Sequence, residues 1–302
     1  MRRQMNRTSK ETLIGFRPLH DSFVGIDSDG CVFPTMDIKQ KQCFHPEIVR
    51  HWKLETIEPY VRESMEFVNL HSKWRGTNRF QALIVTFDFL RDRHEVRASG
   101  VAISALTSLR RYVGSGVPLS NTSLEAEVEK TGDPELTLVL QWSTAINTSI
   151  ERTVKHVPPF AWARESLTRI SAHSDMIVVS QTPEEALVRE WKENGIDGIV
   201  SAIAGQELGT KAEHIAMATK DRYPQHRILM IGDAPGDFKA ARANRAFFFP
   251  VNPGHENESW KCFCAEAYDR FLNGSYGGRY ETDLIAAFDK LLPETPPWIK
   301  SQ

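Results

Sequence analysis

The stretch FVGIDSDGCVF (residues 23–33) joins an apolar run to a closely spaced pair of acidic residues. The run from Phe23 leads into Asp27 and Asp29, and Gly30 follows the second acid. Two carboxylates this close repel each other, so both stay ionised only beside a cation, and otherwise one of them holds a proton. The pattern predicts a strand that ends in a cation site, a catalytic pair or a tight turn.

Four further apolar runs lie along the chain, and most of them also end in small or acidic residues. Together the five runs cover residues 23–27, 176–180, 198–205, 228–233 and 246–251. Runs without polar alternation are typical of strands buried on both faces, as in a parallel sheet. Helical patterns separate the last four runs, at residues 182–195, 210–220 and 236–244. This alternation predicts an α/β fold, a three-layer sandwich with a parallel, Rossmann-like sheet.

The first of these predicted helices carries start and stop residues. Thr182 is at the expected N-cap, Pro183 at the first helical position, and Glu185 would close a capping box with Thr182. Gly195 is the expected stop at the other end.

A long interval between the first and second runs interrupts the alternation. It carries helical patterns at residues 57–70, 79–93, 103–113, 122–130 and 134–154. The interval is too long for a loop in a compact domain, so it predicts an all-α domain inserted after the first strand. We therefore expect an α/β core formed by residues 1–35 and 157–302, and a helical domain over residues 36–156.

The composition is that of an ordinary globular protein, with 41% apolar and 25% charged residues among 302. A formal net charge of −2 gives no overall positive field, so we expect neither nucleic acid nor membrane as a partner. The basic start has no apolar run after it and does not resemble a signal peptide. Four cysteines are too few for a disulfide scaffold, and we expect reduced thiols in a cytoplasmic protein.

Polar side chains follow four of the predicted strands. They are Asp27 and Asp29 after the first, Ser180 and Gln181 after the second, Lys211 after the third, and Asp233 and Asp237 after the fourth. In open α/β sheets, ligands bind outside the carboxyl ends of the strands. If the strands are parallel and adjacent, all of these side chains gather at one edge.

The gathered set is suited to phosphoryl transfer. Asp27 at a strand tip can attack phosphorus and form an aspartyl phosphate, which divides one difficult displacement into two easier ones. A cation must offset the repulsion between this carboxylate and an anionic phosphate, and Mg²⁺ prefers oxygen ligands. Asp27 and Asp233 are predicted to ligate the metal directly. Asp237 would ligate through water or support the ligands.

The remaining members of the set have complementary roles. Asp29 can protonate the leaving alkoxide and then activate the hydrolytic water. Ser180 and Lys211 would hold the phosphoryl oxygens, and Lys211 also offsets the charge of the carboxylates. Gln181, next to Ser180, is expected to contact the substrate.

The segments DSDGCVF, VVSQT, GTK and IGDAPGD, in this order, resemble the four motifs of the haloacid dehalogenase (HAD) superfamily. The resemblance covers residues 20–35 and 157–255, and a helical insert after the first motif is similar to that superfamily's type-1 cap. It implies a phosphotransferase, most often a Mg²⁺-dependent phosphatase. It also implies the same roles as above for six residues: Asp27, Asp29, Ser180, Lys211, Asp233 and Asp237. It further implies that the backbone carbonyl of Asp29 ligates the metal.

Two details refine this resemblance. The position after Gly30 is commonly Thr or Val in the family, whereas this chain has Cys31, a residue that serves packing more than chemistry. The dehalogenases of the superfamily lack the second acid, so the presence of Asp29 favours phosphoryl over halide chemistry.

The segment HSKWRGTNRF (residues 71–80) is the one local indication of substrate recognition in the expected cap. Asn78 or Thr77 would cap the following helix, and a helix N-terminus with arginines can bind an anion. Arg75 and Arg79 are therefore predicted to contact a distal polar or anionic group of the substrate. A solvated loop between two helices would carry the same residues without a function.

The sequence thus predicts a phosphatase that acts on a small phosphomonoester, for example a sugar phosphate. A phosphomutase of the same superfamily stays open, because the residues do not distinguish transfer to water from transfer to substrate. Less favoured are a signalling receiver and a catalytically silent phosphate-binding protein. A receiver carries its acidic pair and its phosphorylated aspartate on different strands, which disfavours it. The oligomeric state and the role of the chain after residue 256 stay open.

Overall fold

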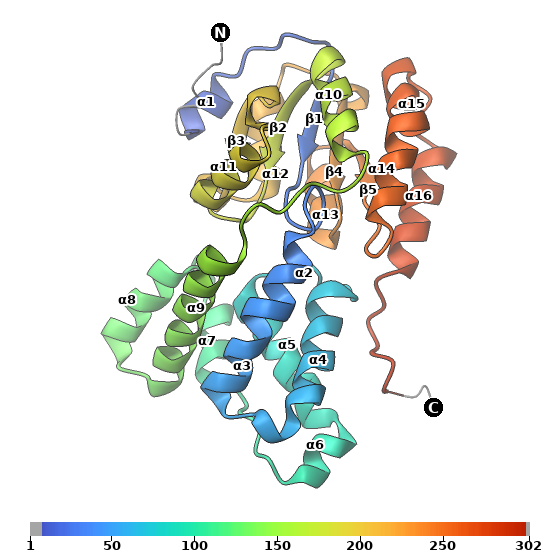
Figure 1. Cartoon of the computed structure of the whole chain (residues 1–302). Coiled ribbons are helices and arrows are strands. Elements are labelled where there is room, and N and C mark those ends of the chain that lie inside the picture. Colours follow the sequence, from blue (N-terminus) through green and yellow to red (C-terminus); the bar gives the residue numbers. More distant parts are fainter. Residues whose placement is uncertain (1–7, 300–302) are drawn as a thin grey trace. The chain divides into compact units, whose positions relative to one another are not determined.

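The computed structural model describes residues 8–299. The chain divides into two compact units, each with its own core. One is an α/β unit formed by Met1–Met36 and His156–Leu292, and the other is a helical unit formed by Asp37–Lys155 and Pro293–Gln302. Figure 1 shows the two kinds of architecture, strands with helices in one unit and helices alone in the other.

The α/β unit is built on a five-stranded, all-parallel sheet with the strand order β3-β2-β1-β4-β5. Its strands are β1 (Phe23–Ile26), β2 (Asp175–Val179), β3 (Ala202–Ala204), β4 (Ile228–Gly232) and β5 (Phe247–Pro250). All five lie within the predicted apolar runs or start one residue before them. The predicted parallel, Rossmann-like sheet is confirmed.

Helices cover both faces of this sheet and complete the three layers (Figure 1). One face packs against α10 (Ala163–His173), α11 (Glu184–Glu193), α14 (Glu256–Cys262) and α15 (Tyr268–Asn273). The other packs against α1 (Lys10–Ile14), α12 (Lys211–Thr219), α13 (Pro235–Ala243) and α16 (Arg279–Lys290).

The central strand β1 explains why the first apolar run is continuous. Val24 and Ile26 point into the core on one face, and Phe23 points into the core on the other. Both faces are buried, so every position must be apolar or small. Gly25 is the small one, since a Cβ there would lie 3.2 Å from the Met230 sulfur and 3.3 Å from a Val179 methyl.

The helical unit contains the all-α insertion that the sequence predicts. Its helices are α2 (Thr35–Lys39, shared with the α/β unit), the π-helical η1 (Gln40–Phe44), α3 (His45–Trp52), α4 (Glu58–Leu70), α5 (Arg79–Asp92), α6 (His94–Ser99), α7 (Thr107–Gly114), α8 (Asn121–Thr131) and α9 (Pro134–Thr153). The buried Trp142 of α9 lies in the core of this unit, and the half-buried Trp52 of α3 packs against it with the ring centres 5.8 Å apart. Apolar side chains of the intervening helices surround them.

The C-terminal segment differs from the expected domain division. The sequence places residues 157–302 in the α/β core, whereas the chain from Pro293 onward groups with the helical unit. The reason is an aromatic cluster, because the Trp298 ring lies 5.6 Å from the Phe67 ring and 6.3 Å from the Phe89 ring. The Arg93 guanidinium lies 4.4 Å from the centre of the Trp298 ring. No pattern in the last ten residues indicates these partners.

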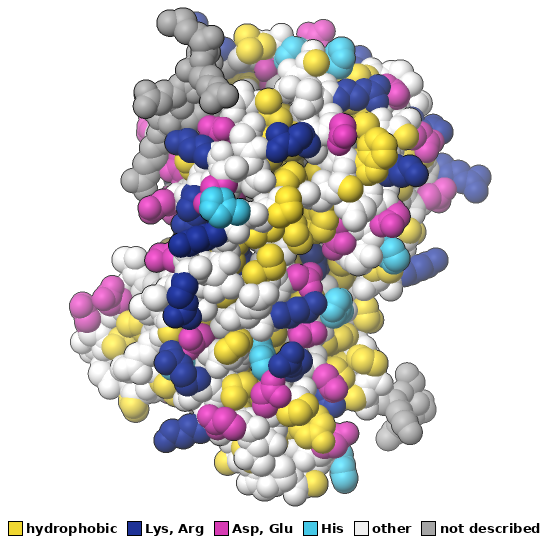
Figure 2. Space-filling view, viewed as in Figure 1, with side chains coloured by type: hydrophobic (Ala, Val, Ile, Leu, Met, Phe, Trp, Pro, Cys, Tyr) yellow, Lys and Arg dark blue, Asp and Glu magenta, His cyan; other side chains and the backbone are white. Residues whose placement is uncertain are grey.

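The surface carries charges of both signs. On the face drawn in Figure 2, Lys and Arg side chains are interspersed with Asp and Glu. This mixing matches the formal net charge of −2. Within residues 8–299, no helix combines the length and the apolar character that a bilayer-spanning segment requires.

Candidate active site

Three carboxylates meet at the carboxyl edge of the sheet. Asp27 follows β1 and Asp233 follows β4, and these two strands are paired in register from Phe23 with Ile228 onward. Asp237 comes from the first turn of α13. One oxygen from each of the three side chains lies within 4.8 Å of the others, and all three residues are buried.

A tight turn between β4 and α13 brings Asp237 back toward Asp233. One Asp237 carboxylate oxygen accepts hydrogen bonds from the backbone N–H groups of Asp233 and Ala234, at 3.1 and 3.0 Å. A Cβ on Gly232 would collide with the Asp237 side chain, so a glycine is required at the end of β4. The glycine in IGDAPGD therefore allows the close approach of two acids.

Lys211 joins the carboxylates from the first turn of α12. A capping box between Thr210 and Glu213 fixes the start of that helix, which places Lys211 at its first position. The Lys211 ammonium lies 2.8 Å from an Asp27 oxygen and 2.5 Å from an Asp237 oxygen. Lys211 therefore bridges Asp27, the proposed nucleophile, and Asp237 of the segment IGDAPGD.

Burial dominates the electrostatics of this cluster. Burial raises the pKa of Asp27 well above its usual value; Lys211 opposes this shift, while the charges of Asp237 and Asp233 reinforce it. Burial also disfavours the charge on Lys211, but the attraction of Asp237 and Asp27 outweighs it and raises the lysine pKa. The cluster thus has an excess of negative charge, and a further cation would stabilise it.

The donor set fits a hard divalent cation. Asp27, Asp233 and Asp237 carry −3 when ionised and Lys211 supplies +1, so these four groups sum to −2. Buried carboxylate oxygens without cysteine or histidine are ligands that Mg²⁺ prefers. The side chains expected to hold Mg²⁺ therefore lie together with a charge and chemistry that suit it.

Two threonine hydroxyls hold the second acid of the first motif. Thr35 donates a hydrogen bond to one carboxylate oxygen of Asp29, and Thr182 donates to the other at 2.6 Å. The predicted N-cap role of Thr182 is therefore wrong. The helix begins at Glu184 with Pro183 at its N-cap position, and no side chain caps it.

Ser180 and Gln181 directly follow β2. Ser180 is buried at the end of β2, where its amide donates to the Ala204 carbonyl at 3.0 Å and its hydroxyl accepts from the Thr182 amide at 3.2 Å. The Gln181 amide group donates to the carbonyls of Ser180 and Gly209, so it ties the second motif loop to the third.

Sequence reasoning missed three supporting residues. Thr35 and Thr182 orient Asp29, and the Trp191 indole donates at 3.0 Å to the hydroxyl of Ser28, the residue between the two acids. The sequence contains a signal only for Thr182, which lies two residues beyond Ser180 in the same loop. Thr35 lies six positions beyond Asp29, whereas Trp191 is 163 positions from Ser28 and reaches the site through tertiary structure.

The predicted cap arginines both belong to the helical unit and have different surroundings. Arg75 is 2% exposed and donates to the Leu70 carbonyl at 2.9 Å. Arg79 begins α5, where Asn78 is the N-cap residue as predicted and accepts from the Phe80 amide. The guanidinium of Arg79 lies over the Phe44 ring and donates to Ser143 and Asn147.

No family model and no curated protein matches the chain. Solved structures do resemble it. One is a haloacid dehalogenase-like family hydrolase from Streptococcus pneumoniae, with 13% identity, a TM-score of 0.43, and coverage of 88% of this chain and 98% of that chain. A second is a beta-phosphoglucomutase from Clostridium difficile, with 12% identity, a TM-score of 0.48, and coverage of 89% and 100%. A third is named a predicted phosphoglycolate phosphatase, from Haemophilus somnus, with 14% identity, a TM-score of 0.44, and coverage of 76% and 84%.

At such identities and TM-scores the likeness decides neither activity nor substrate.

Proposed function

We propose that the protein is a Mg²⁺-dependent phosphatase of the HAD type that hydrolyses a small phosphomonoester through an aspartyl phosphate on Asp27. One observation carries the proposal: three buried carboxylates converge within 4.8 Å, and Lys211 bridges two of them. A structural ion pair has no need of three buried acids, since each added carboxylate costs desolvation and repulsion. A site that accepts a metal and a phosphate explains why this charge is concentrated.

In the first step, a carboxylate oxygen of Asp27 attacks phosphorus and the bond to the leaving oxygen breaks. Asp29 donates a proton to that oxygen, so the product leaves as an alcohol. The Ser180 hydroxyl and Lys211 bind the phosphoryl oxygens during transfer. Thr35 and Thr182 hold Asp29 in place through its two carboxylate oxygens.

In the second step, the Asp29 carboxylate takes a proton from water as the water oxygen attacks phosphorus. The bond between phosphorus and Asp27 breaks, which releases inorganic phosphate and restores the carboxylate. Mg²⁺ would be held by Asp27, Asp233, Asp237 and the backbone carbonyl of Asp29. When bound, it would neutralise part of the negative charge on the phosphate.

The finer features of the proposal concern the helical unit and the cellular setting. The helical unit would act as a cap that excludes water and contacts the leaving group. Arg79 and Arg75 are the proposed contacts to a distal anionic or polar group, with Gln181 beside the phosphate. All four cysteines are free thiols, which supports a reducing compartment such as the cytoplasm.

A panel of small phosphate esters assayed with and without Mg²⁺ tests the proposal. We expect release of phosphate from at least one ester, dependent on the metal. Isotopic oxygen from water should appear in that phosphate, whereas a phosphomutase would return the phosphoryl group to a sugar. Absence of metal-dependent turnover on every ester, together with no phosphate trapped on Asp27 in an Asp29→Asn variant, would refute it.

A further inference from the structure

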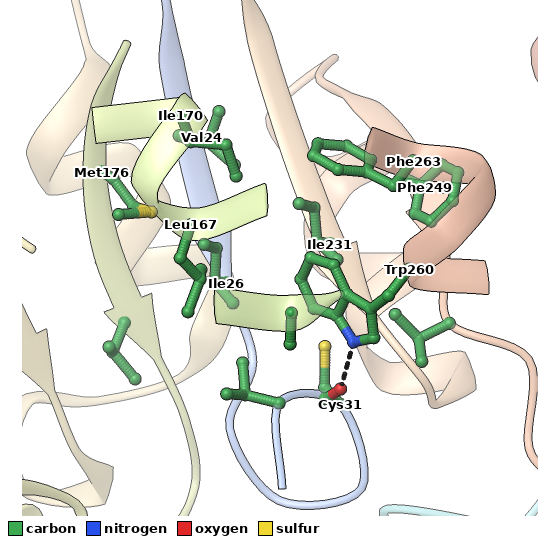
Figure 3. Packing of buried hydrophobic residues seen from close by; sticks show 14 of the residues in the cluster. Val24, Ile26, Cys31, Leu167, Ile170, Met176, Ile231, Phe249, Trp260 and Phe263 are labelled. Atoms are coloured by element: carbon green, nitrogen blue, oxygen red, sulfur yellow. Dashed lines mark hydrogen bonds between the residues drawn. The ribbon is translucent and has the colours of Figure 1, made fainter. Parts of the chain in front are cut away.

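The chain beyond β5 contains a tryptophan that reaches the catalytic loop. Trp260 lies in α14 and is fully buried. Its indole N–H donates to the backbone carbonyl of Cys31 at 2.8 Å (Figure 3). Cys31 lies only two residues beyond Asp29. A helix to which the sequence assigned no role therefore contacts the loop that carries Asp29.

The loop over residues 28–33 is a compact turn held by its own backbone. The Ser28 carbonyl accepts hydrogen bonds from the amides of Cys31, Val32 and Phe33, at 3.3, 2.9 and 3.1 Å. The Gly30 amide donates to the Phe33 carbonyl at 2.8 Å, and Gly30 has a φ of +77°, which favours glycine. A turn bonded in this way moves as one piece, so its outer contacts decide where Asp29 lies relative to Asp27, which precedes the turn.

Indole N–H groups supply two of these outer contacts. Trp191 of α11 donates to the hydroxyl of Ser28 at 3.0 Å, and Trp260 donates to Cys31 near the other end of the turn. The Trp260 ring is itself fixed, because it packs edge-on against Phe263 at 5.7 Å within the core of that face. The direction of its N–H is therefore fixed by packing.

The same helix also holds the chain where it returns from the helical unit to β2. The Asn257 side chain of α14 accepts a hydrogen bond from the Ala161 amide at 2.8 Å. The next residue back, Phe160, donates its amide to the Val32 carbonyl at 2.9 Å. Helix α14 thus braces the catalytic loop twice, directly through Trp260 and indirectly through the returning segment.

We propose that Trp260 is a positioning residue that holds the catalytic loop, and with it Asp29, through the Cys31 carbonyl. When the indole donor is removed, the buried Cys31 carbonyl loses its hydrogen-bond partner. The loop is then expected to shift so that this carbonyl reaches water or another donor. Asp29 then loses its alignment with Asp27. The effect on the loop is independent of the proposed function, and the effect on turnover rests on it.

The test compares Trp260→Phe with Trp142→Phe in the full chain. The first variant keeps an aromatic ring and removes the donor. Trp142 is equally buried, and among the described residues its indole N–H has no partner, so the second variant removes a ring of the same size without a hydrogen bond. We expect amide hydrogen exchange over residues 28–33 to accelerate about tenfold in Trp260→Phe and to stay unchanged in Trp142→Phe.

Turnover gives the second measurement. In Trp260→Phe we expect kcat to fall about tenfold with KM within roughly twofold, and the pH profile of kcat to shift because Asp29 acts in both steps. A smaller folded fraction would lower activity without moving the pH profile. Equal loop exchange in the two variants would overturn the proposal, and so would an unmoved pH profile. Faster loop exchange in a protein whose wild type hydrolyses no ester would support the positioning and refute the phosphatase.

A milder variant keeps the test valid if Trp260→Phe does not fold. Asn257→Ala alters an exposed side chain and removes only the indirect brace. We expect exchange over residues 28–33 to accelerate about threefold, a smaller effect than the loss of the direct bond. Unchanged exchange of that loop in Asn257→Ala would contradict the bracing role of α14.

Discussion

The two units use charge in opposite ways. The α/β unit buries Asp27, Asp233 and Asp237 together, at 4%, 0% and 0% exposure. The helical unit forms exposed pairs within single helices, such as Arg62 with Glu58 at 2.7 Å. Exposed pairs contribute little and occur on ordinary helices, whereas buried acids persist only when something else stabilises them. The buried charges of the α/β unit therefore indicate a functional site, whereas most charges of the helical unit do not.

Arg79 departs from this pattern of exposed ion pairs. Among the described residues its guanidinium has only neutral hydrogen-bond partners, from Ser143 and Asn147, and it stacks on Phe44. Its partial burial lowers the pKa of the guanidinium to about 10, so the group would gain from an anion. This feature makes Arg79 the strongest candidate in that unit for contact with substrate.

The largest expected effect tests the buried acids. Asp27→Asn should lower kcat by roughly 10⁴-fold or more, because it removes the proposed nucleophile without much change of shape. Thermal melting should show a folded protein, since the substitution also removes a carboxylate that is repelled by two others. Steady-state kinetics on the best ester of the panel provides the measurement. Turnover near the wild-type rate would show that the buried acids of the α/β unit are no more functional than the exposed charges of the helical unit.

The next effect concerns the pH dependence of stability in the α/β unit. His214 is fully buried, and burial lowers its pKa to about 4, with the nearby charge of Lys211 acting in the same direction. In the unfolded chain a histidine titrates near pH 6.5, so the stability linked to neutral His214 is complete above that pH and lost as the pH falls toward 4. The loss amounts to about 3 kcal/mol.

His214→Leu should remove this pH dependence. Urea unfolding at pH 7.5 and pH 4.5 measures it, because the wild type loses free energy of unfolding between these values and the variant loses less. The measurement at pH 7.5 serves as the control for any change in packing. An equal loss in both proteins would show that His214 does not titrate as its burial requires.

A smaller effect tests the C-terminal segment in the helical unit. Trp298→Ala should lower the free energy of unfolding of that unit by about 2 kcal/mol, because the half-buried ring contacts Phe67, Phe89 and Arg93. The neighbouring Ile299 is 42% exposed, and Ile299→Ala is the matched control, with an expected change within about 0.5 kcal/mol. Differential scanning calorimetry distinguishes them. Equal melting of the two variants would mean that Trp298 does not anchor the segment.

The smallest expected effect asks whether the helical unit recognises charge. Arg79→Gln should raise KM for the best substrate about tenfold with kcat little changed, since it removes one charged hydrogen-bond donor. Arg91 on the same helix is paired with Asp88 and also donates to the Ser104 carbonyl, so Arg91→Gln is the matched control. A KM for Arg79→Gln equal to that of Arg91→Gln would leave the helical unit without a role in binding charge.

The α/β unit was predictable because parallel strands impose a simple rule. Each buried strand appears as an apolar run, and the side chains that follow the runs must meet at one edge. The positions of Asp27, Lys211 and Asp233 follow from this rule. Thr182 shows where the rule ends, because its hydroxyl suits an N-cap and a carboxylate equally well, and only the proximity of Asp29 in space selects the second partner.

The sequence by itself determined the parallel sheet, the helical insertion and the acids and lysine of the site, because each is encoded in local periodicity and in residues adjacent to strands. Tertiary structure alone decided the partners that come from distant parts of the chain. Trp260 is 229 positions from Cys31, and Trp298 binds an aromatic cluster from α4 and α5. Such contacts depend on the packing of whole layers, and one side chain in a sequence carries no record of the surface that it will meet.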